Sequence, residues 1–276
     1  MIWRCRDRRF DLDERALVMG VLNVTPDSFS DGGRYLDPED AVSHGRELVA
    51  EGADLVDVGA ESTRPGSSPV PPAEQIARLT PVIAPLVRAG ACVSVDTASA
   101  EVARAAIAWG AVVVNDVTAL RDPAMGPLIA ELGAGVVLMH MKGAPATMQD
   151  HPRYADVTGD VLDWFGVRLR GARRMGIAEE QIVVDPGIGF GKTAAHNREL
   201  LARLGAFAAL KRPVLVGLSR KRFLSEPGEL PADARLERGL AATAIAVFEG
   251  ARIVRTHDVH ETKRAIEIAE AIRRGR

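Results

Sequence analysis

Short apolar runs alternate with stretches of helical periodicity along most of the chain. Eight of these runs end at a polar or small residue, and each is followed by a segment of helical character. Consecutive apolar positions are typical of parallel strands buried on both faces, and their alternation with helices predicts a parallel sheet. The runs lie at 17–23, 55–59, 92–96, 112–115, 136–140, 182–185, 214–219 and 253–257.

Eight strand and helix units predict a closed (β/α)8 TIM barrel, an α/β fold, which we expect to form a single domain over residues 1–276. In this fold the carboxyl ends of all strands surround one opening, here called the barrel mouth. Polar residues within or just after the runs should therefore meet there, although they are distant in sequence. These residues are Asn23, Asp57, Asp96, Asn115, His140, Asp185, Ser219 and His257.

The first residues of the chain fall outside this repeat. Apolar positions in residues 2–14 alternate loosely on either side of a charged stretch at 6–9. Such alternation is typical of short antiparallel strands. We therefore expect a small N-terminal hairpin that closes the floor of the barrel, opposite the mouth.

Overall charge and composition exclude several function classes. The formal net charge of −2 gives no general affinity for nucleic acid or anionic membranes. The N-terminus has no apolar signal core, and no run approaches the length of about 18 residues that a membrane span needs. The two cysteines, Cys5 and Cys92, are expected to be reduced thiols. We expect a cytoplasmic enzyme.

The last predicted helix, 259–273, suggests a second copy of the chain as a partner. It carries more apolar surface than one contact with the barrel requires, and we expect a C2 homodimer through the C-terminal helices. The alternative is that the whole stripe packs onto the eighth strand, because every outer barrel helix needs such a face. The stripe consists of Ala265, Ile266, Ile268, Ala269 and Ile272.

A glycine-rich segment follows the sixth predicted strand, at 185–192. It is not a Walker A phosphate loop, because the four-residue gap between the first glycine and the Gly-Lys pair is missing. The glycines would let the backbone pass close to a flat ligand while Phe190 covers one face. A plain tight turn is the alternative interpretation.

Two carboxylates and one amide at predicted strand ends indicate the ligand. Asp96 and Asp185 follow apolar runs, and a buried carboxylate is costly unless hydrogen-bond donors surround it. A ligand with several N–H groups would supply such donors. Asn115 has both a donor and an acceptor and can complete the recognition of a heterocyclic amide. Together they indicate a nitrogen-rich bicyclic substrate, although each residue taken singly could be structural.

Basic residues gather at the same strand ends of a slightly acidic protein. A cluster of this kind indicates a bound polyanion such as phosphate or pyrophosphate. The oxygen of Asn23 suits Mg²⁺, which keeps most of its waters and bridges to phosphate oxygens. We do not expect a metal cage made entirely of protein ligands. The basic residues are Arg64, Arg220, Lys221, Arg255 and His257.

Eight ordered motifs between about residues 16 and 260 together resemble the dihydropteroate synthase family. No single motif would be specific, but their order is. They are Met19-Gly-Val-Leu-Asn-Val-Thr-Pro-Asp-Ser-Phe-Ser-Asp-Gly-Gly33, Asp57-Val-Gly-Ala-Glu-Ser-Thr-Arg-Pro-Gly66, Ser94-Val-Asp-Thr97, Asn115-Asp-Val117, Met139-His-Met141, the segment 185–192, Ser219-Arg-Lys221 and Arg255-Thr-His-Asp-Val259.

The resemblance implies a folate-pathway transferase. It would join 6-hydroxymethyl-7,8-dihydropterin diphosphate to 4-aminobenzoate and release pyrophosphate, by a dissociative mechanism in which Asp96, Lys221 and Asn23 have the catalytic roles. The pterin site implied by the resemblance comprises Asp96, Asn115, Met139, Asp185, Phe190, Gly217 and Lys221.

Two further subsites come with the resemblance. The diphosphate site corresponds to Asn23, Arg64, Arg255 and His257, with Asn23 at the Mg²⁺ position. The aminobenzoate site corresponds to Phe29, Thr63, Pro65, Ser219, Lys221 and Arg222. Arg222 stands where many relatives have serine, which puts in doubt a hydroxyl contact to the aminobenzoate carboxylate. Ser225 stands where glycine is frequent.

Two other functions are compatible with much of this pattern. A pterin-dependent methyltransferase uses a similar barrel but needs no diphosphate cluster, so Arg64, Arg255 and His257 argue against it. A non-catalytic pterin-binding paralogue is the second alternative, and the intact motifs that follow the first two strands argue against that.

Overall fold

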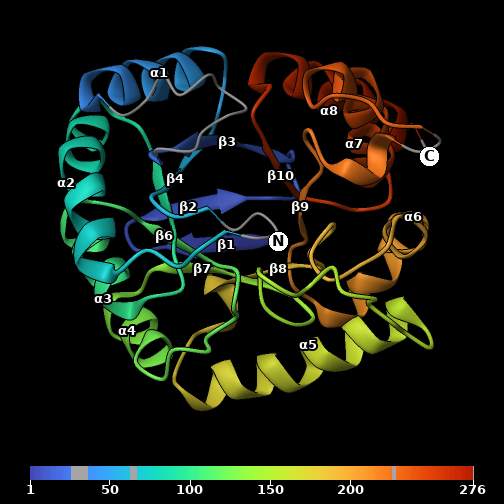
Figure 1. The fold of residues 1–276 in the computed structure, drawn as a ribbon, viewed down its shortest axis with the longest axis horizontal. Helices are drawn as coiled ribbons and strands as arrows, with labels where there is room; N and C mark the ends of the chain where they lie inside the picture. Colours follow the sequence, from blue (N-terminus) through green and yellow to red (C-terminus); the bar gives the residue numbers. More distant parts are fainter. Residues whose placement is uncertain (26–36, 63–66, 226–227, 276) are drawn as a thin grey trace.

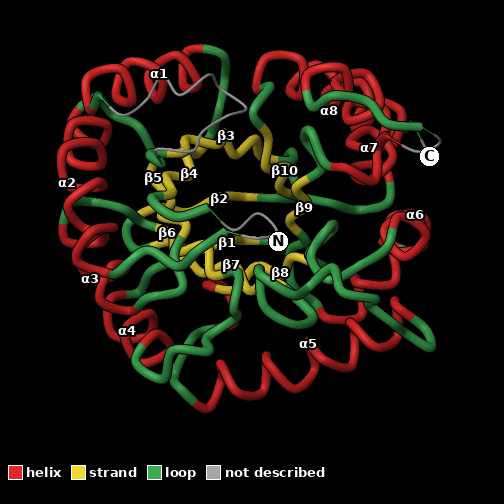
Figure 2. The backbone as a smooth tube through the Cα atoms, in the orientation of Figure 1, coloured by secondary structure: helices red, strands yellow, loops and turns green. Residues whose placement is uncertain are grey.

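Eight parallel strands form a nearly closed barrel inside a ring of helices, which confirms the predicted fold (Figures 1 and 2). The computed structural model describes residues 1–25, 37–62, 67–225 and 228–275. The barrel strands are β3 (Leu17–Asn23), β4 (Leu55–Gly59), β5 (Val93–Asp96), β6 (Val113–Asp116), β7 (Gly135–Met139), β8 (Ile182–Asp185), β9 (Leu215–Gly217) and β10 (Ile253–Thr256).

The helices follow the strands in alternation, as the right-handed connections of parallel strands require. They are α1 (Pro38–Ala50), α2 (Pro72–Arg88), α3 (Ala100–Ala108), α4 (Met125–Leu132), α5 (Val157–Arg174), α6 (Ala194–Ala202), α7 (Leu236–Phe248) and α8 (Val259–Arg274). Short 3-10 helices lie at Glu179–Gln181, Leu204–Leu210, Arg222–Ser225 and Asp233–Arg235. Several helices begin at a capping side chain; Asp37, for example, accepts a hydrogen bond from Glu39 N.

Closure of the barrel depends on its shortest strand. The order of hydrogen-bonded strands is β8-β7-β6-β5-β4-β3-β10-β9. The two ends of this sheet meet at a single parallel bridge between Val184 and Val214, and Val184 N donates to Pro213 O at 3.0 Å. This contact brings β8 beside β9, so the carboxyl ends of all eight strands surround the mouth.

Alternate residues of the strands form two separate apolar regions. One set, which includes Val56, Val95 and Val184, packs against the helices. The other set lines the lower half of the barrel interior and packs against the hairpin. Its strand members are Leu17, Met19, Leu55, Val113, Val137, Val183, Leu215 and Ile253. Both faces of the strands are therefore buried in apolar surroundings.

The predicted hairpin is confirmed. β1 (Ile2–Cys5) and β2 (Arg8–Asp11) pair in antiparallel register, and in Figure 1 they cross the middle of the ring of strands. Trp3 is fully buried in the lower interior, where its Nε1 donates to Gln181 O at 3.0 Å. The hairpin therefore fills the floor, and the polar residues remain at the other end.

The predicted strand bounds agree with the structure to within one residue, except at the seventh strand. The prediction of 214–219 is too long, because β9 covers only Leu215–Gly217. The backbone of Arg220 has φ of 58°, outside the strand region, so the chain turns directly after this strand. Within the described residues, no helix is both long enough and apolar enough to cross a membrane.

Candidate active site at the barrel mouth

The strand register places the first polar residues of the site in one row. Asn23 of β3 pairs with Gly59 of β4, Gly59 pairs with Asp96 of β5, and Asp96 pairs with Asn115 of β6. Residues paired across parallel strands point to the same face of the sheet. The barrel thus brings together three side chains, from positions 23, 96 and 115, that the sequence predicted to meet.

A buried ion-pair network lies at this row. Nε of Arg255 donates to Oδ2 of Asp57 at 2.6 Å, and its Nη2 donates to Oδ2 of Asp96 at 2.9 Å. Asn115 Nδ2 donates to the same oxygen of Asp57 at 2.9 Å. We expected a ligand to supply the donors for Asp96. This expectation was incomplete, because Arg255 is already its partner.

Electrostatics at Asp96 depend on this network. The pKa of Asp96 is raised to about 7, mainly by burial; Arg255 lowers it, and the charge of Asp57 contributes to the increase. The desolvation of the carboxylate outweighs its pairing with one shared guanidinium. Asp96 is therefore a carboxyl group that can change its charge near neutral pH.

Asp185 and Lys221 form the other side of the site. Oδ1 of Asp185 accepts a hydrogen bond from Gly187 N at 2.7 Å, and burial raises the pKa of this carboxyl. Lys221 Nζ donates to Ile188 O and lies 4.5 Å from the centre of the Phe190 ring. Burial lowers the pKa of Lys221 to about 8. A carboxylate, an ammonium group and an aromatic ring thus lie around one loop.

The glycine-rich loop is held in a fixed path. Gly187 and Gly191 have φ of 68° and 62°, and a Cβ at either position would lie 1.9 Å from His140 O or 2.3 Å from Lys142 O. Only glycine fits such close approaches of two backbones. Gly189 N donates to Asn197 Oδ1 at 2.8 Å. These contacts explain Gly187 and Gly191 by close packing against the backbone of His140 and Lys142, and the close approach of the loop to a ligand stays a prediction.

Lys192 is a residue whose position the sequence did not predict. Its Nζ is buried 2.9 Å from His140 Nδ1 and 3.0 Å from the carbonyl oxygens of Gly187 and Phe190. Burial lowers the pKa of His140 to about 3, so its ring is neutral and Nδ1 accepts a hydrogen bond. The signal in the sequence was a lysine directly after three alternating glycines. Its ammonium binds the protein's own carbonyls.

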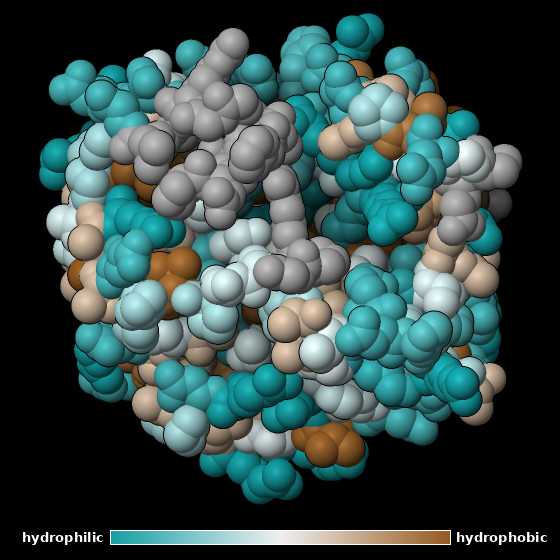
Figure 3. Space-filling view, in the orientation of Figure 1, coloured by the Kyte–Doolittle hydropathy of each residue, from teal (hydrophilic) through white to brown (hydrophobic). Residues whose placement is uncertain are grey.

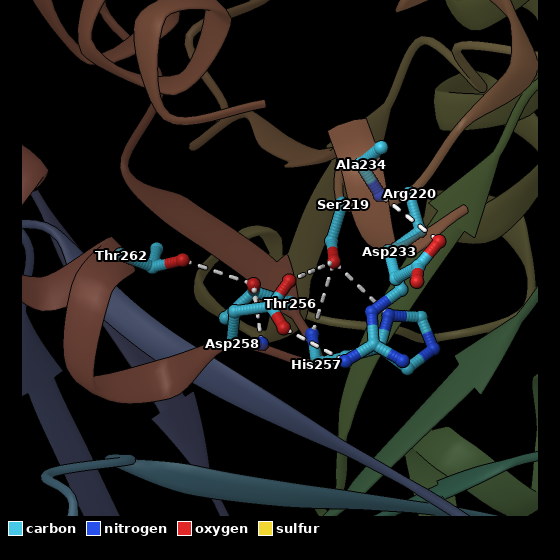
Figure 4. A network of polar contacts seen from close by, with 8 residues as sticks. All are labelled: Ser219, Arg220, Asp233, Ala234, Thr256, His257, Asp258 and Thr262. Atoms are coloured by element: carbon cyan, nitrogen blue, oxygen red, sulfur yellow. Dashed lines mark hydrogen bonds and ion pairs between the residues drawn. The ribbon is translucent and has the colours of Figure 1, made fainter. Parts of the chain in front are cut away.

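A third network joins the ends of β9 and β10 (Figure 4). Ser219 Oγ donates to Asp258 Oδ2 at 3.0 Å and lies 3.1 Å from His257 Nδ1. Arg220 Nη2 donates to Asp258 Oδ1 at 2.8 Å. Of the basic cluster expected from the sequence, Arg220 and Arg255 are thus paired with carboxylates. The positive charge that can bind an anion is therefore smaller than the number of basic residues at the mouth suggests.

The remaining predicted site residues differ in placement. Met139 and Phe190 belong to one small apolar cluster with Val117, Met141 and Met148. Arg222 lies on the 3-10 helix after β9, where its side chain is 88% exposed and 3.5 Å from Glu229 Oε1.

Four predicted residues, Phe29, Thr63, Arg64 and Pro65, lie outside the described residues. Two cavities among the described residues lie away from the ion-pair network at the mouth, one at the hairpin and the other beside Arg15 and Glu270.

Comparisons with known proteins identify the family to which the chain belongs. The pterin binding enzyme family matches residues 19–257. The dihydropteroate synthase of Escherichia coli K12 is 44% identical over 255 residues, which cover 92% of this chain and 90% of that protein. A probable bifunctional folylpolyglutamate synthase/dihydropteroate synthase of Haloferax volcanii is 48% identical over 93% of this chain, and the chain spans only 30% of that longer protein.

Solved structures show the same architecture. The dihydropteroate synthase of Yersinia pestis, in a sulfonamide drug complex, has a TM-score of 0.95 and 40% identity, with 99% of this chain and 100% of that chain covered. The enzyme of Xanthomonas albilineans in complex with 7,8-dihydropteroate has a TM-score of 0.87 and 42% identity, with 99% and 98% covered.

Proposed function

The chain belongs to the dihydropteroate synthase family of pterin binding enzymes, and from this premise we propose how its barrel mouth carries out the reaction. The reaction is the transfer of a dihydropterin from 6-hydroxymethyl-7,8-dihydropterin diphosphate to 4-aminobenzoate, which yields 7,8-dihydropteroate and pyrophosphate. The observation that carries the assignment of residues is the row of polar side chains at Asn23, Asp96 and Asn115, with Arg255 bonded to Asp96.

The pterin is recognised by its edge and by its faces. Asp96, Asn115, Asp185 and Lys221 supply the acceptors and donors that match the N–H groups and carbonyl of the ring. Met139 and Phe190 contribute the apolar contacts to its faces, and Gly217 leaves room beside Arg255 and Lys221, whose nearest atoms are 3.8 and 4.0 Å from the position of a Cβ. A few polar groups in an otherwise apolar site are typical of a small-molecule pocket.

The diphosphate is assigned to Asn23, Arg64, Arg255 and His257, together with Mg²⁺. Among the described residues, no three His, Cys, Asp or Glu side chains are grouped to hold a metal. Oδ1 of Asn23 and Oδ2 of Asp96 each lie 3.8 Å from the point where a Cβ on Gly59 would sit. Asp96 Oδ2 already accepts from Arg255, so the single neutral oxygen of Asn23 would hold an Mg²⁺ ion that keeps most of its waters. Such an ion would supply positive charge to the leaving diphosphate.

The aminobenzoate subsite is assigned to Phe29, Thr63, Pro65, Ser219, Lys221 and Arg222. Ser219 and Lys221 follow β9 directly, so they lie at the same rim as the pterin residues. The guanidinium of Arg222 is exposed there and can form two parallel hydrogen bonds to a carboxylate.

Charge development explains the role of Asp96. The bond between the pterin methylene carbon and the diphosphate oxygen breaks, and positive charge forms on the methylene and ring. The ionised carboxylate of Asp96 stabilises this charge without any reorganisation. The neutral amino nitrogen of 4-aminobenzoate then forms the new C–N bond and loses a proton. This second step needs correct position rather than a strong base.

A second copy of the chain is the partner that we assign to the C-terminal helices. The predicted apolar stripe divides: Ile266 and Ala269 are buried against the barrel, whereas Ile268 and Ile272 are 60% and 59% exposed. Ile245 of α7 is 55% exposed, and α7 packs against α8. Apolar atoms over these helices are visible at the upper right of Figure 3. Three exposed isoleucines on two adjacent helices favour a C2 dimer interface.

One incubation tests the proposed reaction. The purified protein is mixed with the dihydropterin diphosphate, 4-aminobenzoate and Mg²⁺, and both 7,8-dihydropteroate and pyrophosphate are measured. We expect the two products in equal amounts. Binding of the pterin without either product would indicate a non-catalytic paralogue. Methyl transfer from a methylated pterin would indicate the methyltransferase alternative. Either result would contradict the proposal.

A further inference from the structure

Asp57 is the buried residue that links Arg255 to Asn115 in the ion-pair network at the barrel mouth. It lies in the middle of β4, where it pairs in register with Val21 and Ser94, two positions before Gly59. Its side chain is completely buried, in the layer directly below Asp96. One oxygen, Oδ2, accepts from both Arg255 Nε at 2.6 Å and Asn115 Nδ2 at 2.9 Å.

We infer that Asp57 is a positioning residue for the transfer reaction. Asp57 orients the amide of Asn115 toward the pterin, and it binds one side of the guanidinium of Arg255, so that Arg255 is shared between two carboxylates. This inference rests on the proposed function, because Asn115, Arg255 and Asp96 carry out roles in that reaction. Asp57 itself is covered by these side chains and acts through them.

The orientation of Asn115 follows from hydrogen-bond chemistry. An ionised carboxylate can only accept, so the amide of Asn115 must present its Nδ2 to Asp57. Its Oδ1 is then the atom that can accept a hydrogen bond from a pterin N–H. An asparagine at position 57 would accept or donate equally well, and either orientation of the Asn115 amide would be allowed.

The ionisation of Asp96 depends on the sharing of the Arg255 guanidinium between Asp57 and Asp96. Asp57 attracts the Nε side of the guanidinium, which leaves Asp96 only the Nη2 hydrogen bond. A guanidinium that paired with Asp96 alone in a two-point geometry would neutralise that carboxylate more completely. The negative charge of Asp57 also raises the pKa of Asp96 directly. Both effects make Asp96 less firmly ionised than a simple salt bridge would.

A structural role alone does not account for the carboxylate at this position. Oδ1 of Asp57 is buried and has no hydrogen-bond partner among the residues that the structure describes. A buried carboxylate with one unpaired oxygen is unfavourable, and apolar side chains of similar size often stabilise such sites better. The layer below it is apolar, with Leu55 and Met19 as neighbours in register. The cost of burying this charge is offset by the two hydrogen bonds through which Asp57 holds Arg255 and Asn115 at the mouth.

The test is Asp57→Asn, measured with both substrates from about pH 5 to about pH 9, with folding checked by circular dichroism. We expect kcat/KM for the dihydropterin diphosphate to fall about tenfold to a hundredfold, as for loss of hydrogen bonds to a charged group. We expect the KM for 4-aminobenzoate to change little. The acidic limb of kcat/KM should move to lower pH by about one unit, since a like charge beside Asp96 is removed.

Asp116→Asn is the matched control. Asp116 is equally buried at the end of β6, two strands from β4, but its carboxylate binds only its own turn, accepting from Thr118 N at 2.8 Å and Leu120 N at 2.7 Å. Of the neighbouring negative charges that raise the pKa of Asp96, Asp116 has a smaller effect than Asp57. This variant should keep the wild-type kcat/KM. A limb shift as large as that of Asp57→Asn would contradict the inference.

A double-mutant cycle with Arg255→Gln separates positioning from general damage. If Asp57 acts through Arg255, adding Asp57→Asn to Arg255→Gln should lower kcat/KM less than it does in the wild-type background. Additive losses would overturn the inference, as would a single Asp57→Asn variant with unchanged kcat/KM and pH limb. If Asp57→Asn alone does not fold, the comparison within the Arg255→Gln background still gives the limb shift. Wild-type protein that forms no dihydropteroate would refute the proposed function instead.

Discussion

Nη2 of Arg255 lies 2.9 Å from Oδ2 of Asp96, and this contact joins β10 to β5 across the barrel mouth. The guanidinium does not neutralise Asp96 fully, because it also donates a hydrogen bond to the buried Asp57. The result is a carboxyl group that is positioned by a cation and yet titrates near neutral pH. The pH dependence, the stability and the catalytic behaviour of the protein should all reflect this arrangement.

The rate should rise with pH through the titration of Asp96. Burial raises the pKa of this carboxyl to about 7, and only its ionised form stabilises the developing positive charge. Below that pH the group is protonated and neutral, so kcat/KM for the dihydropterin diphosphate should fall on the acidic side. A profile measured from about pH 5 to about pH 9 should show this limb. A flat profile from about pH 5 to about pH 8 would exclude Asp96 as the titrating group.

Arg255→Ala should destabilise the protein more in alkaline than in acidic solution. At about pH 8 the substitution leaves Asp57 and Asp96 buried without their cation, a loss of about 3 kcal/mol in the free energy of unfolding. Because the native pKa of Asp96 lies above its unfolded value, protonation of Asp96 relieves part of this cost as the pH falls below about 7. Denaturant unfolding at about pH 5 and about pH 8 compares the two. An equal loss at both would show that the charges are not the cause.

Lys192→Met should weaken pterin binding while leaving aminobenzoate binding nearly intact. Methionine keeps the length of the side chain but leaves the carbonyls of Gly187 and Phe190 without their donor. We expect the Kd for the pterin to rise about tenfold, because one or two buried hydrogen bonds are lost. Lys142→Met is the control, since Lys142 is nearby but exposed. Calorimetric titration showing the same Kd for Lys192→Met and wild type would contradict this role.

Ile272→Asp should convert a dimer into a monomer. The side chain of Ile272 is 59% exposed on α8, and a buried charge at the centre of an interface opposes association. Sedimentation velocity at micromolar concentration gives the mass of each species. Val167→Asp is the matched control, because Val167 is 57% exposed on α5. A wild-type protein that sediments only as a monomer, or an Ile272→Asp variant that stays dimeric, would remove this interface.

Local pattern was sufficient for the fold. The bounds predicted for β3, β4 and β8 coincide with the structure, because each strand is a mostly apolar run with a polar or glycine end, although β4 has Asp57 in its middle. β9 was predicted too long, since Leu218 and Ser219 continue the pattern while the backbone already turns toward the positive φ of Arg220. The sequence pattern does not contain the backbone angle that ends a strand.

The network at the site could be predicted only in part. The residues at strand ends were identified because barrel topology brings them together. The pairing of Arg255 with Asp57, 198 positions apart, depends on which side chains face one another across the closed barrel. The bond between Lys192 and His140, 52 positions apart, depends on the path of the glycine loop. Neither has a local signature, so the sequence placed Asp57 at the mouth without a specific role and included Lys192 only as part of the glycine-rich segment.

The most direct test of the account is the Asp96→Asn variant. Asparagine keeps the shape and one hydrogen bond to Arg255 but removes the negative charge, which matters most when positive charge develops on the substrate. The measurement compares kcat with the Kd for the dihydropterin diphosphate in wild type and variant. We expect a fall in kcat much larger than the loss of affinity, and no acidic limb near pH 7. Equal losses in affinity and turnover would contradict the role of Asp96 in stabilising the developing charge.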